Sequence, residues 1–249
     1  MVEKPKIIVV ILAQNSEKTI GKTYQDIPHG LVKKIIIHDD ASKDRTVYIA
    51  KRLGLETIVQ KISKGYGGSQ KAAYTEALKQ NADVIVMLHA DYQYDPKKIP
   101  ELVRPLIEGK RDIMLGSRMI GKGALRGRMP LWRYVGNKVL TKIENIVLGL
   151  DLSEFHTGLR AYNRNFLQTI PFKLNSDDFV FDQQVLIQAV VFGFKERIGE
   201  IGIPTRYFKE GSSISLKNSL IYTLDTVKSL LIYILHKYRI KTSKNLIRK

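Results

Sequence analysis

The segment His89-Ala90-Asp91-Tyr92-Gln93 places several polar side chains directly after an apolar run, Val84–Leu88. A carboxylate at a strand end suits a hard divalent cation that holds a diphosphate, and Mg²⁺ or Mn²⁺ needs only one or two protein ligands there. Asp91 and Gln93 are the candidate oxygen ligands, and His89 suits Mn²⁺ better than Mg²⁺ because imidazole prefers transition metals. The alternative is a loop whose acid caps the helix near Pro96. These residues alone favour neither interpretation.

A second acidic segment, Asp39-Asp40-Ala41-Ser42-Lys43-Asp44, also follows a short aliphatic run. Two adjacent carboxylates can accept hydrogen bonds from a base imide or from ribose hydroxyls. Asp and Ser also cap helices routinely, and Asp44 is well placed to do so. Nucleotide binding and capping both remain open for this segment.

The segment from Gly65 to Ser69 contains three glycines and precedes an expected helix, Gln70–Gln80. Backbone N–H groups of such a loop, beginning at Gly65, can cradle a phosphate or a ribose. The segment is neither the dinucleotide fingerprint nor a P-loop, because the glycine spacing differs and no Gly-Lys-Ser/Thr follows. It is weak evidence when taken alone.

Elements that would position these segments alternate along the first half of the chain. Continuous, β-branched runs of this kind are typical of strands buried on both faces of a parallel sheet. The expected strands are Ile7–Leu12, Ile35–Ile37, Thr57–Val59, Val84–Leu88 and Ile113–Leu115, and the expected helices lie near 17–25, 44–53, 69–80 and 97–109. The alternation predicts a doubly wound α/β sheet, with its ligand at the carboxyl ends of the strands. Residues 13–17, 39–44 and 89–95 would meet there.

The second half has a different pattern. A basic, glycine-containing stretch near 121–128 precedes two helices with apolar stripes, Leu131–Leu148 and Ser219–Ile240. Between them, Phe179–Phe192 reads as helical and Ile201–Tyr207 as extended. Both striped helices carry cationic flanks, as helices that lie in a membrane interface do. The alternative is that the stripes pack on the domain or on a second subunit.

Six segments in this order resemble the family 2 glycosyltransferases, in the branch with the polyprenyl-phosphate sugar synthases. They are Ile7–Glu17, Asp39–Thr46, Gly65–Ala73, Val84–Pro96, Gly116-Ser117-Arg118 and Thr157–Tyr162, and the likeness runs from about residue 5 to 215. The resemblance implies a GT-A-type, doubly wound and mostly parallel sheet flanked by helices. It also implies a UDP- or GDP-linked sugar donor, a divalent metal (Mg²⁺ or Mn²⁺) and inversion at the anomeric carbon.

The resemblance also assigns roles by position. Residues bordering or binding the nucleotide would be Ala13, Asn15, Glu17, Asp39, Gly65, Ala90 and Asp91. Asp91, Gln93 and His89 would hold the metal, and Asp182 matches the carboxylate near the acceptor. Arg206 and Lys209 match a segment that closes over the phosphates.

Two positions depart from the family pattern. The first strand usually ends Pro-Ala-Tyr-Asn-Glu, whereas this chain has Leu12-Ala13-Gln14-Asn15-Ser16, which moves the acid to Glu17. The first acid of the Asp-x-Asp pair is replaced by His89, which removes a negative charge from the metal site. The fold assignment is unaffected, but a catalytically weakened carbohydrate-assembly partner becomes an alternative.

The acceptor determines which chemistry is needed. A hydroxyl acceptor requires a general base, for which Asp182 is the candidate. A polyprenyl phosphate is already ionised and needs only cationic positioning. The candidate cations are Arg118, Arg126, Arg128, Arg133 and Arg160. We expect a lipid-linked or glycan acceptor, with a slight preference for the lipid because of the basic tail.

Composition sets the outer limits. The 249 residues carry 41 basic and 24 acidic side chains, a net charge of +17, and no cysteine. We expect one domain over 1–215, with a nucleotide-binding half near 5–118 and an acceptor half near 119–215, and then an amphipathic helix and basic tail over 216–249. No apolar run approaches the roughly 20 residues that span a bilayer, and no signal peptide is recognised. We therefore expect a cytoplasmic protein, peripheral on the cytoplasmic face of an anionic membrane.

Two other classes compete. A nucleic-acid binder would explain the charge but not the three polar strand ends, and no recognition motif is present, so we expect no nucleic-acid partner. A sugar nucleotidyltransferase shares the architecture, but it would usually open with a glycine-rich, Arg-bearing loop where this chain has Ala13–Glu17.

Overall fold

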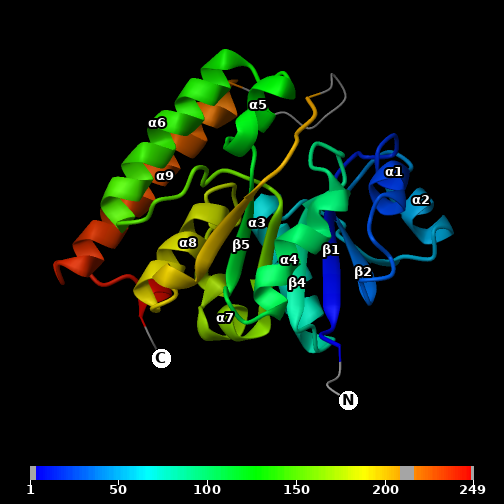
Figure 1. Cartoon of the computed structure of the whole chain (residues 1–249), viewed down its shortest axis with the longest axis horizontal. Coiled ribbons are helices and arrows are strands. Elements are labelled where there is room, and N and C mark those ends of the chain that lie inside the picture. The colour runs from blue at the N-terminus through cyan, green and yellow to red at the C-terminus, as the bar shows by residue number, and fades with distance from the viewer. Residues whose placement is uncertain (1–3, 208–215, 248–249) are drawn as a thin grey trace.

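β1 (Ile7–Ala13) is an interior strand of the sheet, and all seven of its residues are buried. It pairs in parallel with β2 on one side and β4 on the other. In the computed structural model, which describes residues 4–207 and 216–247, the sheet has seven strands in the order β3-β2-β1-β4-β6-β5-β7. Figure 1 labels β2, β1, β4 and β5 of this sheet. The other strands are β2 (Lys34–Asp39), β3 (Glu56–Val59), β4 (Val84–His89), β5 (Ile113–Ser117), β6 (Arg160–Asn163) and β7 (Ile198–Gly202). The expected mostly parallel, doubly wound sheet is confirmed.

Alternate residues of each central strand supply two separate apolar clusters, because successive side chains point to opposite faces. Ile8 and Val10 enter one cluster, and Val9 and Ile11 enter the other. The first cluster is covered by α3 (Gly65–Lys79), α7 (Arg164–Thr169) and α8 (Phe181–Val191), and the second by α1 (Ile20–Gln25), α2 (Thr46–Arg52) and α4 (Ile99–Ile107). Burial on both faces explains why the strands read as continuous apolar runs.

β6 is the strand that the sequence did not reveal. It runs antiparallel to both β4 and β5 and places Arg160 opposite Met87 and Leu115. Its four residues, Arg-Ala-Tyr-Asn, contain no aliphatic run. Pairing with two neighbours, not local composition, makes this segment a strand.

The glycine segment is the first turn of α3, not the expected loop before it. The backbone N–H groups of Gly67 and Gly68 donate to the carbonyl of Asp177, at 2.6 and 3.1 Å. A Cβ on Gly67 would lie 2.8 Å from the Cβ of Phe181. These two glycines therefore allow α3 to approach the start of α8 closely, and their N–H groups are already bonded within the protein.

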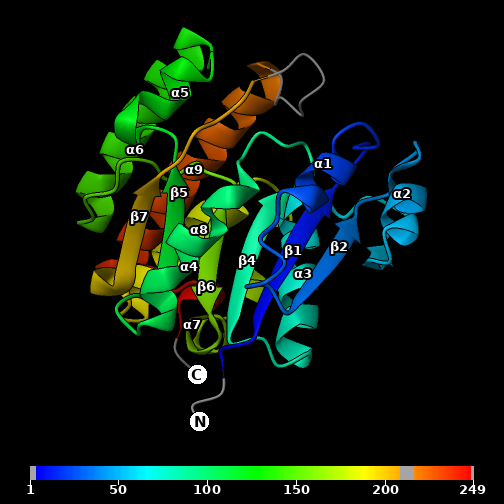
Figure 2. The same ribbon diagram turned by 45° about the vertical axis from the view of Figure 1, so that its right-hand side comes forward.

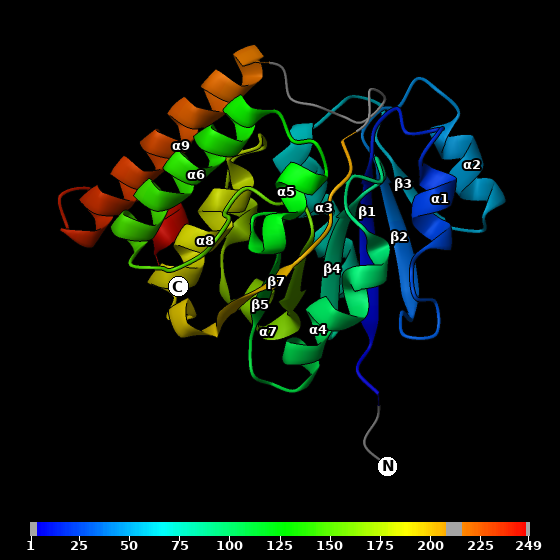
Figure 3. The same ribbon diagram turned by 45° about the horizontal axis from the view of Figure 1, so that its top comes forward.

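α6 (Leu131–Leu148) and α9 (Leu216–Lys237) contact each other and lie side by side beyond α8, away from β1 and β2 (Figures 2 and 3). The short α5 (Gly123–Arg126) precedes α6. Leu230 and Tyr233 of α9 join the first cluster. No helix within residues 4–207 and 216–247 is long and apolar enough to cross a membrane.

Large parts of the apolar stripes of α6 and α9 are exposed, although Val147 of α6 and Ile234 of α9 pack against the first cluster. On α6, Leu131 is 72% exposed and Val135 57%, and on α9, Leu220 is 61% exposed and Leu224 70%. Leu140 is an exception, because it is buried. The chain's own core thus leaves most of both stripes uncovered.

Candidate active site

A cavity of about 960 Å³ opens at the carboxyl ends of β1 and β4. Its walls come from both halves of the chain and continue between α6 and α9. Eight residues singled out from the sequence line it, namely Ala13, Gly65, His89, Asp91, Gln93, Arg118, Arg133 and Asp182. Topology alone brings them together, since they are spread over most of the chain.

Asp91 is buried in the cavity wall after β4. Among the described residues its carboxylate takes one hydrogen bond, from the backbone N–H of Gln93 at 3.1 Å, and no ion pair. Burial raises the pKa of Asp91 to about 6, although the hydrogen bond from Gln93 and the positive charge of Arg118 act in the opposite direction. Its ionised form would be stabilised by a cation.

The two carboxylates after β2 have different surroundings. Both oxygens of Asp39 accept hydrogen bonds from Ser42, from its N–H at 3.0 Å and its hydroxyl at 2.5 Å, and Asp39 does not line the cavity. Asp40 does line it, while bonding Ser63 Oγ at 2.6 Å and the N–H of Lys64 at 2.8 Å. Of the two adjacent carboxylates, Asp40 is therefore the one that faces the cavity.

Asn15 and Glu17 brace the loop before α2. The side-chain oxygen of Asn15 accepts from the N–H of Lys43 at 2.8 Å, and that of Glu17 from the N–H of Arg45 at 3.0 Å. Neither lines the cavity, and Ala90 is buried in the second apolar cluster. These three residues therefore do not face the cavity.

Asp182 lies in the first turn of α8 at the cavity wall. Its carboxylate accepts hydrogen bonds from Tyr66 Oη at 2.9 Å and Gln70 Nε2 at 2.8 Å. Arg160 Nη2 lies 3.5 Å from the same carboxylate. The carboxylate is thus held from three directions.

Arg160 is completely buried beneath the wall, not on it. Its guanidinium donates to the carbonyls of Thr157 and Phe155, at 2.8 and 2.6 Å. Those bonds shape the segment before β6. The expected contact of Arg160 with phosphate is therefore not available in this arrangement.

His89 points toward Tyr66. Its Nε2 lies 3.1 Å from Tyr66 Oη, and its ring packs edge-on against both Tyr66 and Tyr94. Desolvation, with a smaller contribution from Arg118 and Arg160, lowers the pKa of His89 to about 4. The imidazole is therefore neutral at physiological pH.

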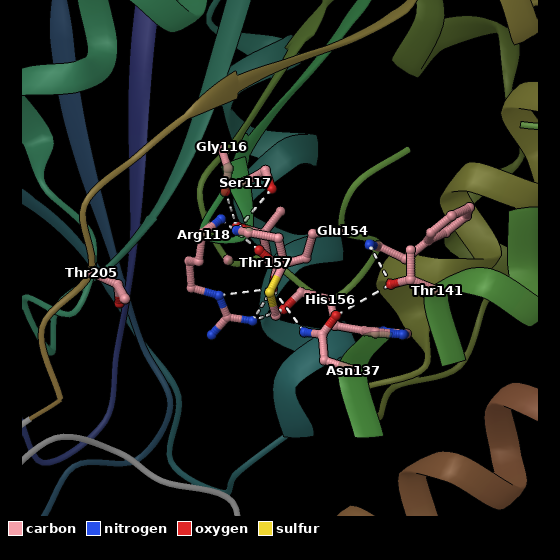
Figure 4. A network of polar contacts seen from close by, with 12 residues as sticks. Gly116, Ser117, Arg118, Asn137, Thr141, Glu154, His156, Thr157 and Thr205 are labelled. Atoms are coloured by element: carbon pink, nitrogen blue, oxygen red, sulfur yellow. Dashed lines mark hydrogen bonds and ion pairs between the residues drawn. The ribbon is translucent and has the colours of Figure 1, made fainter. Parts of the chain in front are cut away.

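Arg118 is the buried cation of the cavity (Figure 4). Its Nε and Nη2 bond the carboxylate of Glu154, Nη2 also bonds the carbonyl of His156 at 2.5 Å, and Nη1 bonds Tyr207 Oη at 2.8 Å. Glu154 also accepts from Asn137 of α6, at 2.8 Å. Within residues 4–207 and 216–247, four of the five guanidinium N–H groups are used and one on Nη1 is not.

A second buried group joins the two outer helices. His156 Nε2 lies 2.9 Å from Glu144 of α6, and its Nδ1 lies 2.5 Å from Tyr222 Oη of α9. His156 and Tyr222 both line the cavity. The segment before β6 therefore holds α6 and α9 together at the cavity.

The remaining predicted cations lie elsewhere. The guanidinium of Arg206 stacks over Tyr92, with Cζ 4.7 Å from the ring centroid, and its Nη2 lies 3.4 Å from Asp95. Arg206 does not line the cavity, and neither do Arg126 or Arg128. Lys209 lies outside the described residues.

A divalent metal fits one side of this cavity. Asp91 is a buried carboxylate without an ion-pair partner among the described residues, and Gln93 lies beside it in the wall. No group of three or more His, Cys, Asp or Glu side chains in the described part of the chain could hold an ion alone. The residues therefore suit an ion that takes most of its ligands from a diphosphate, as Mg²⁺ commonly does.

Several residues of the site carried no sequence signal. Glu154 stands in an unremarkable stretch and becomes important only because β5 delivers Arg118 beside it. Tyr66 was read as part of a glycine loop, and Gln70 as an ordinary helix position. The one possible signal was Gln70, a polar residue at a buried position of its helix.

Comparison with known proteins places the chain in a family. Residues 8–170 match the family model described as Glycosyl transferase family 2. An uncharacterized protein of Methanocaldococcus jannaschii is 32% identical over 83% of this chain and 84% of its own length. The chain belongs to the family 2 glycosyltransferases, and it is an enzyme of that class.

Two further similarities are informative. A UDP-N-acetylglucosamine–dolichyl-phosphate N-acetylglucosaminyltransferase of Methanococcus voltae is 28% identical over 89% of this chain and 96% of its own length. The solved glucosyl-3-phosphoglycerate synthase of Mycobacterium tuberculosis, in complex with Mn²⁺, UDP-glucose and phosphoglyceric acid, superimposes with a TM-score of 0.70 at 20% identity. That superposition covers 92% of this chain and 79% of the synthase, and it confirms the GT-A fold.

Proposed function

We propose that this glycosyltransferase moves a sugar, with inversion, from a UDP- or GDP-linked donor to a polyprenyl phosphate at the cytoplasmic face of an anionic membrane. The observation that carries the proposal is the chemical division of the cavity. One end is polar and includes Asp40, Asp91 and Gln93, and the other is apolar and lies between α6 and α9.

The apolar end suits a hydrocarbon chain. Val139 and Ile143 of α6 and Leu220 and Val227 of α9 line the cavity, and all four are at least 40% exposed. An acceptor made only of polar groups would leave these side chains in water, whereas an isoprenoid would cover them. Two relatives have names that specify a dolichyl-phosphate acceptor, in Methanococcus voltae and Haloferax volcanii.

At the donor end, Ala13, Gly65 and Asp40 would border the nucleotide. Asp91 and Gln93 would hold a divalent metal on the diphosphate, and His89 lies beside them with its Nε2 directed at Tyr66. The metal would stabilise the negative charge that develops on the leaving diphosphate. Arg206 and Lys209 would add positive charge if they turn toward the phosphates.

At the acceptor end, Arg118 would position the attacking phosphate. Most of its charge is balanced by Glu154, but one N–H remains for an oxygen of the ligand. Arg133 lines the same wall and is the second candidate. An ionised phosphate needs no general base, and this agrees with an Asp182 carboxylate already held by Tyr66 and Gln70.

Membrane contact would come from α6, within the catalytic domain over 1–215, and from α9 and the basic tail, which we propose form an appendage over 216–249. The exposed stripes lie beside exposed cations, namely Lys138, Lys142, Lys228, Lys237, Arg239 and Lys241. Each cation near an anionic leaflet contributes about 1 kcal/mol. Apolar and cationic groups together favour such a surface over a neutral protein partner.

A donor screen tests the proposal. The purified chain is given UDP- and GDP-sugars with Mn²⁺ or Mg²⁺, with and without polyprenyl phosphate, and release of nucleoside diphosphate is followed. We expect one donor to be consumed, with the rate raised by the lipid. Asp91→Asn should lower the rate at least about a hundredfold, whereas Glu108→Gln, on the exposed surface, should leave it unchanged.

Other outcomes point to the competing functions. Stimulation by a soluble glycan but not by the lipid would assign a hydroxyl acceptor, with Asp182 as its base. Donor binding without turnover under either metal would indicate a carbohydrate-assembly partner. Pyrophosphate release from a nucleoside triphosphate and a sugar phosphate would indicate a nucleotidyltransferase.

A further inference from the structure

His89, Tyr66 and Asp182 form a continuous hydrogen-bond chain across the cavity wall. The chain runs from the end of β4 through the first turn of α3 to the first turn of α8. Its two links measure 3.1 Å, from Nε2 to Oη, and 2.9 Å, from Oη to Oδ2. Three elements distant in sequence are thereby joined at one carboxylate.

The chemistry of the three groups determines which of them donates and which accepts in each hydrogen bond. Ionised Asp182 only accepts, and the Tyr66 hydroxyl has one proton to give. That proton goes to Asp182, so the Tyr66 oxygen must accept from His89, whose proton is therefore on Nε2. Gln70 is fixed in the same sense, because its carbonyl accepts from Tyr74 and its amide donates to Asp182.

We propose that His89 is a positioning residue for Asp182 and acts through Tyr66. The inference rests on the proposed function, because Asp182 lines the cavity in which the acceptor would bind, and the family resemblance places this carboxylate near the acceptor. An acid at position 89, as in the family pattern, would compete with Asp182 for the single Tyr66 proton. With histidine at position 89, the Tyr66 proton is donated to Asp182 alone. The replacement of the first acid by His89 therefore preserves the hydrogen bond to Asp182 and is not simply damage to a metal site.

Close packing supports a fixed imidazole. A Cβ on Gly158 would lie 2.8 Å from His89 Nε2 and 2.9 Å from Cε2 of Tyr94. The Gly158 N–H also donates to Tyr94 Oη at 2.8 Å. The ring therefore sits between two tyrosines and a backbone, and it has little room to turn toward Asp91.

An NMR experiment that does not depend on activity tests the hydrogen-bond chain directly. The five histidines are labelled with ¹⁵N, and their ring signals are recorded in the wild type, Tyr66→Phe and Asp182→Asn. We expect His89 to carry its proton on Nε2, and its signal to move in both variants. Tyr222→Phe is the matched control, because that hydroxyl bonds His156 and should move the His156 signal instead.

Kinetics then test the positioning role. His89→Gln keeps an amide N–H donor near the position of Nε2, so kcat should stay within about threefold of the wild type. His89→Leu and His89→Asp have no such donor. They should lower kcat about tenfold, which is the effect of one lost hydrogen bond. KM for the donor should change by less than about twofold. In a Tyr66→Phe background all three substitutions should have equal kcat, because the link is already broken.

Results that contradict the positioning role of His89 can be distinguished from results that contradict the proposed function. A His89 proton on Nδ1, or a signal unmoved by Tyr66→Phe, would overturn the proposal even in an active enzyme. So would a His89→Leu effect that persists undiminished in Tyr66→Phe, since a purely structural role would behave in that way. Loss of Mn²⁺ affinity in His89→Gln with kcat retained would make His89 a metal ligand instead. A wild-type chain that transfers no sugar would refute the function while the ring signals still decide the hydrogen-bond chain.

Discussion

Adjacent residues of the same type have different tasks in this site. Asp39 bonds Ser42 through both oxygens, whereas Asp40 faces the cavity. Likewise, Arg118 lines the cavity and Arg160 lies beneath it, although both belong to segments that resemble the family. At this scale, function depends on which direction a side chain takes after the strand ends.

His38 gives a pH-dependent stability. It is completely buried in β2, and desolvation lowers its pKa below the ordinary value of 6.5. The neutral imidazole of His38 contributes stability that is fully present above pH 6.5 and is lost as the pH falls through that value. The loss is about 1.4 kcal/mol for each unit by which the folded-state pKa lies below 6.5. Urea unfolding of the wild type and His38→Gln should give free energies that diverge between about pH 7.5 and pH 5. Parallel curves would contradict the assignment.

Glu154 should be costly to neutralise. Glu154→Gln removes the charge that balances Arg118 in a buried environment, and we expect unfolding free energy to fall by about 3–5 kcal/mol. Glu101→Gln is the matched control, since its ion pair with Lys98 at 2.6 Å lies at the surface and is worth about 1 kcal/mol or less. Chemical denaturation measures both, and equal losses would show that the buried pair adds nothing.

The sequence predicted which segments form the site better than it predicted which residues face the ligand. Asp91, Gln93 and Asp182 were singled out and line the cavity, because strand ends and family motifs locate them. Glu154 and Gln70 were not, because their importance comes from neighbours more than 30 residues away in sequence. Side-chain direction and distant pairing are the information that a single sequence lacks.

Elements were predicted well wherever the sequence has a clear apolar pattern. Five strands of the parallel part were identified from continuous apolar runs, and α6 was placed with the bounds that the structure has. β6 was missed because it has no such run, and the start of α3 was misplaced because glycines read as a loop. Local composition failed at the two places where contact between elements decides the conformation.

The approach of α3 to α8 depends on Gly67. We expect Gly67→Ala to lower the unfolding free energy by about 1–3 kcal/mol, because the added methyl group meets Phe181 and a backbone carbonyl. Gly21→Ala, in α1 with nothing within 4 Å of an added Cβ, should instead raise it by up to about 1 kcal/mol. Thermal unfolding of both variants measures the contrast. A neutral Gly67→Ala would mean that the two helices separate at little cost.

For the whole molecule, the net charge of +17 and the uncovered faces of α6 and α9 have a joint consequence. The polar end of the cavity belongs to the sheet, and the apolar end belongs to helices beyond it. If those helices contact a membrane, the cavity opens where a lipid acceptor would be. Charge would bring the protein to the surface, and apolar contact would hold it there.

Leu224→Glu tests that arrangement. Leu224 is 70% exposed on α9, and its loss from a lipid interface should weaken binding to anionic vesicles about tenfold or more. Ile62→Glu is the control, because Ile62 is 81% exposed but lies in the loop between β3 and α3, outside α9. Vesicle sedimentation should also show weaker binding of the wild type as salt rises. Equal effects of the two substitutions would exclude a specific α9 face.

The reversed direction of β6 has one more consequence. Because β6 runs against β4, its first residues and not its last lie at the cavity, and the segment 149–159 enters the wall just before them. Glu154 and His156 therefore lie in one contiguous stretch, beside Arg118. That stretch lies outside β1, β2 and β4. Under the proposed function, changes in this stretch would let acceptor preference diversify in evolution while the strands of the donor end are inherited unchanged.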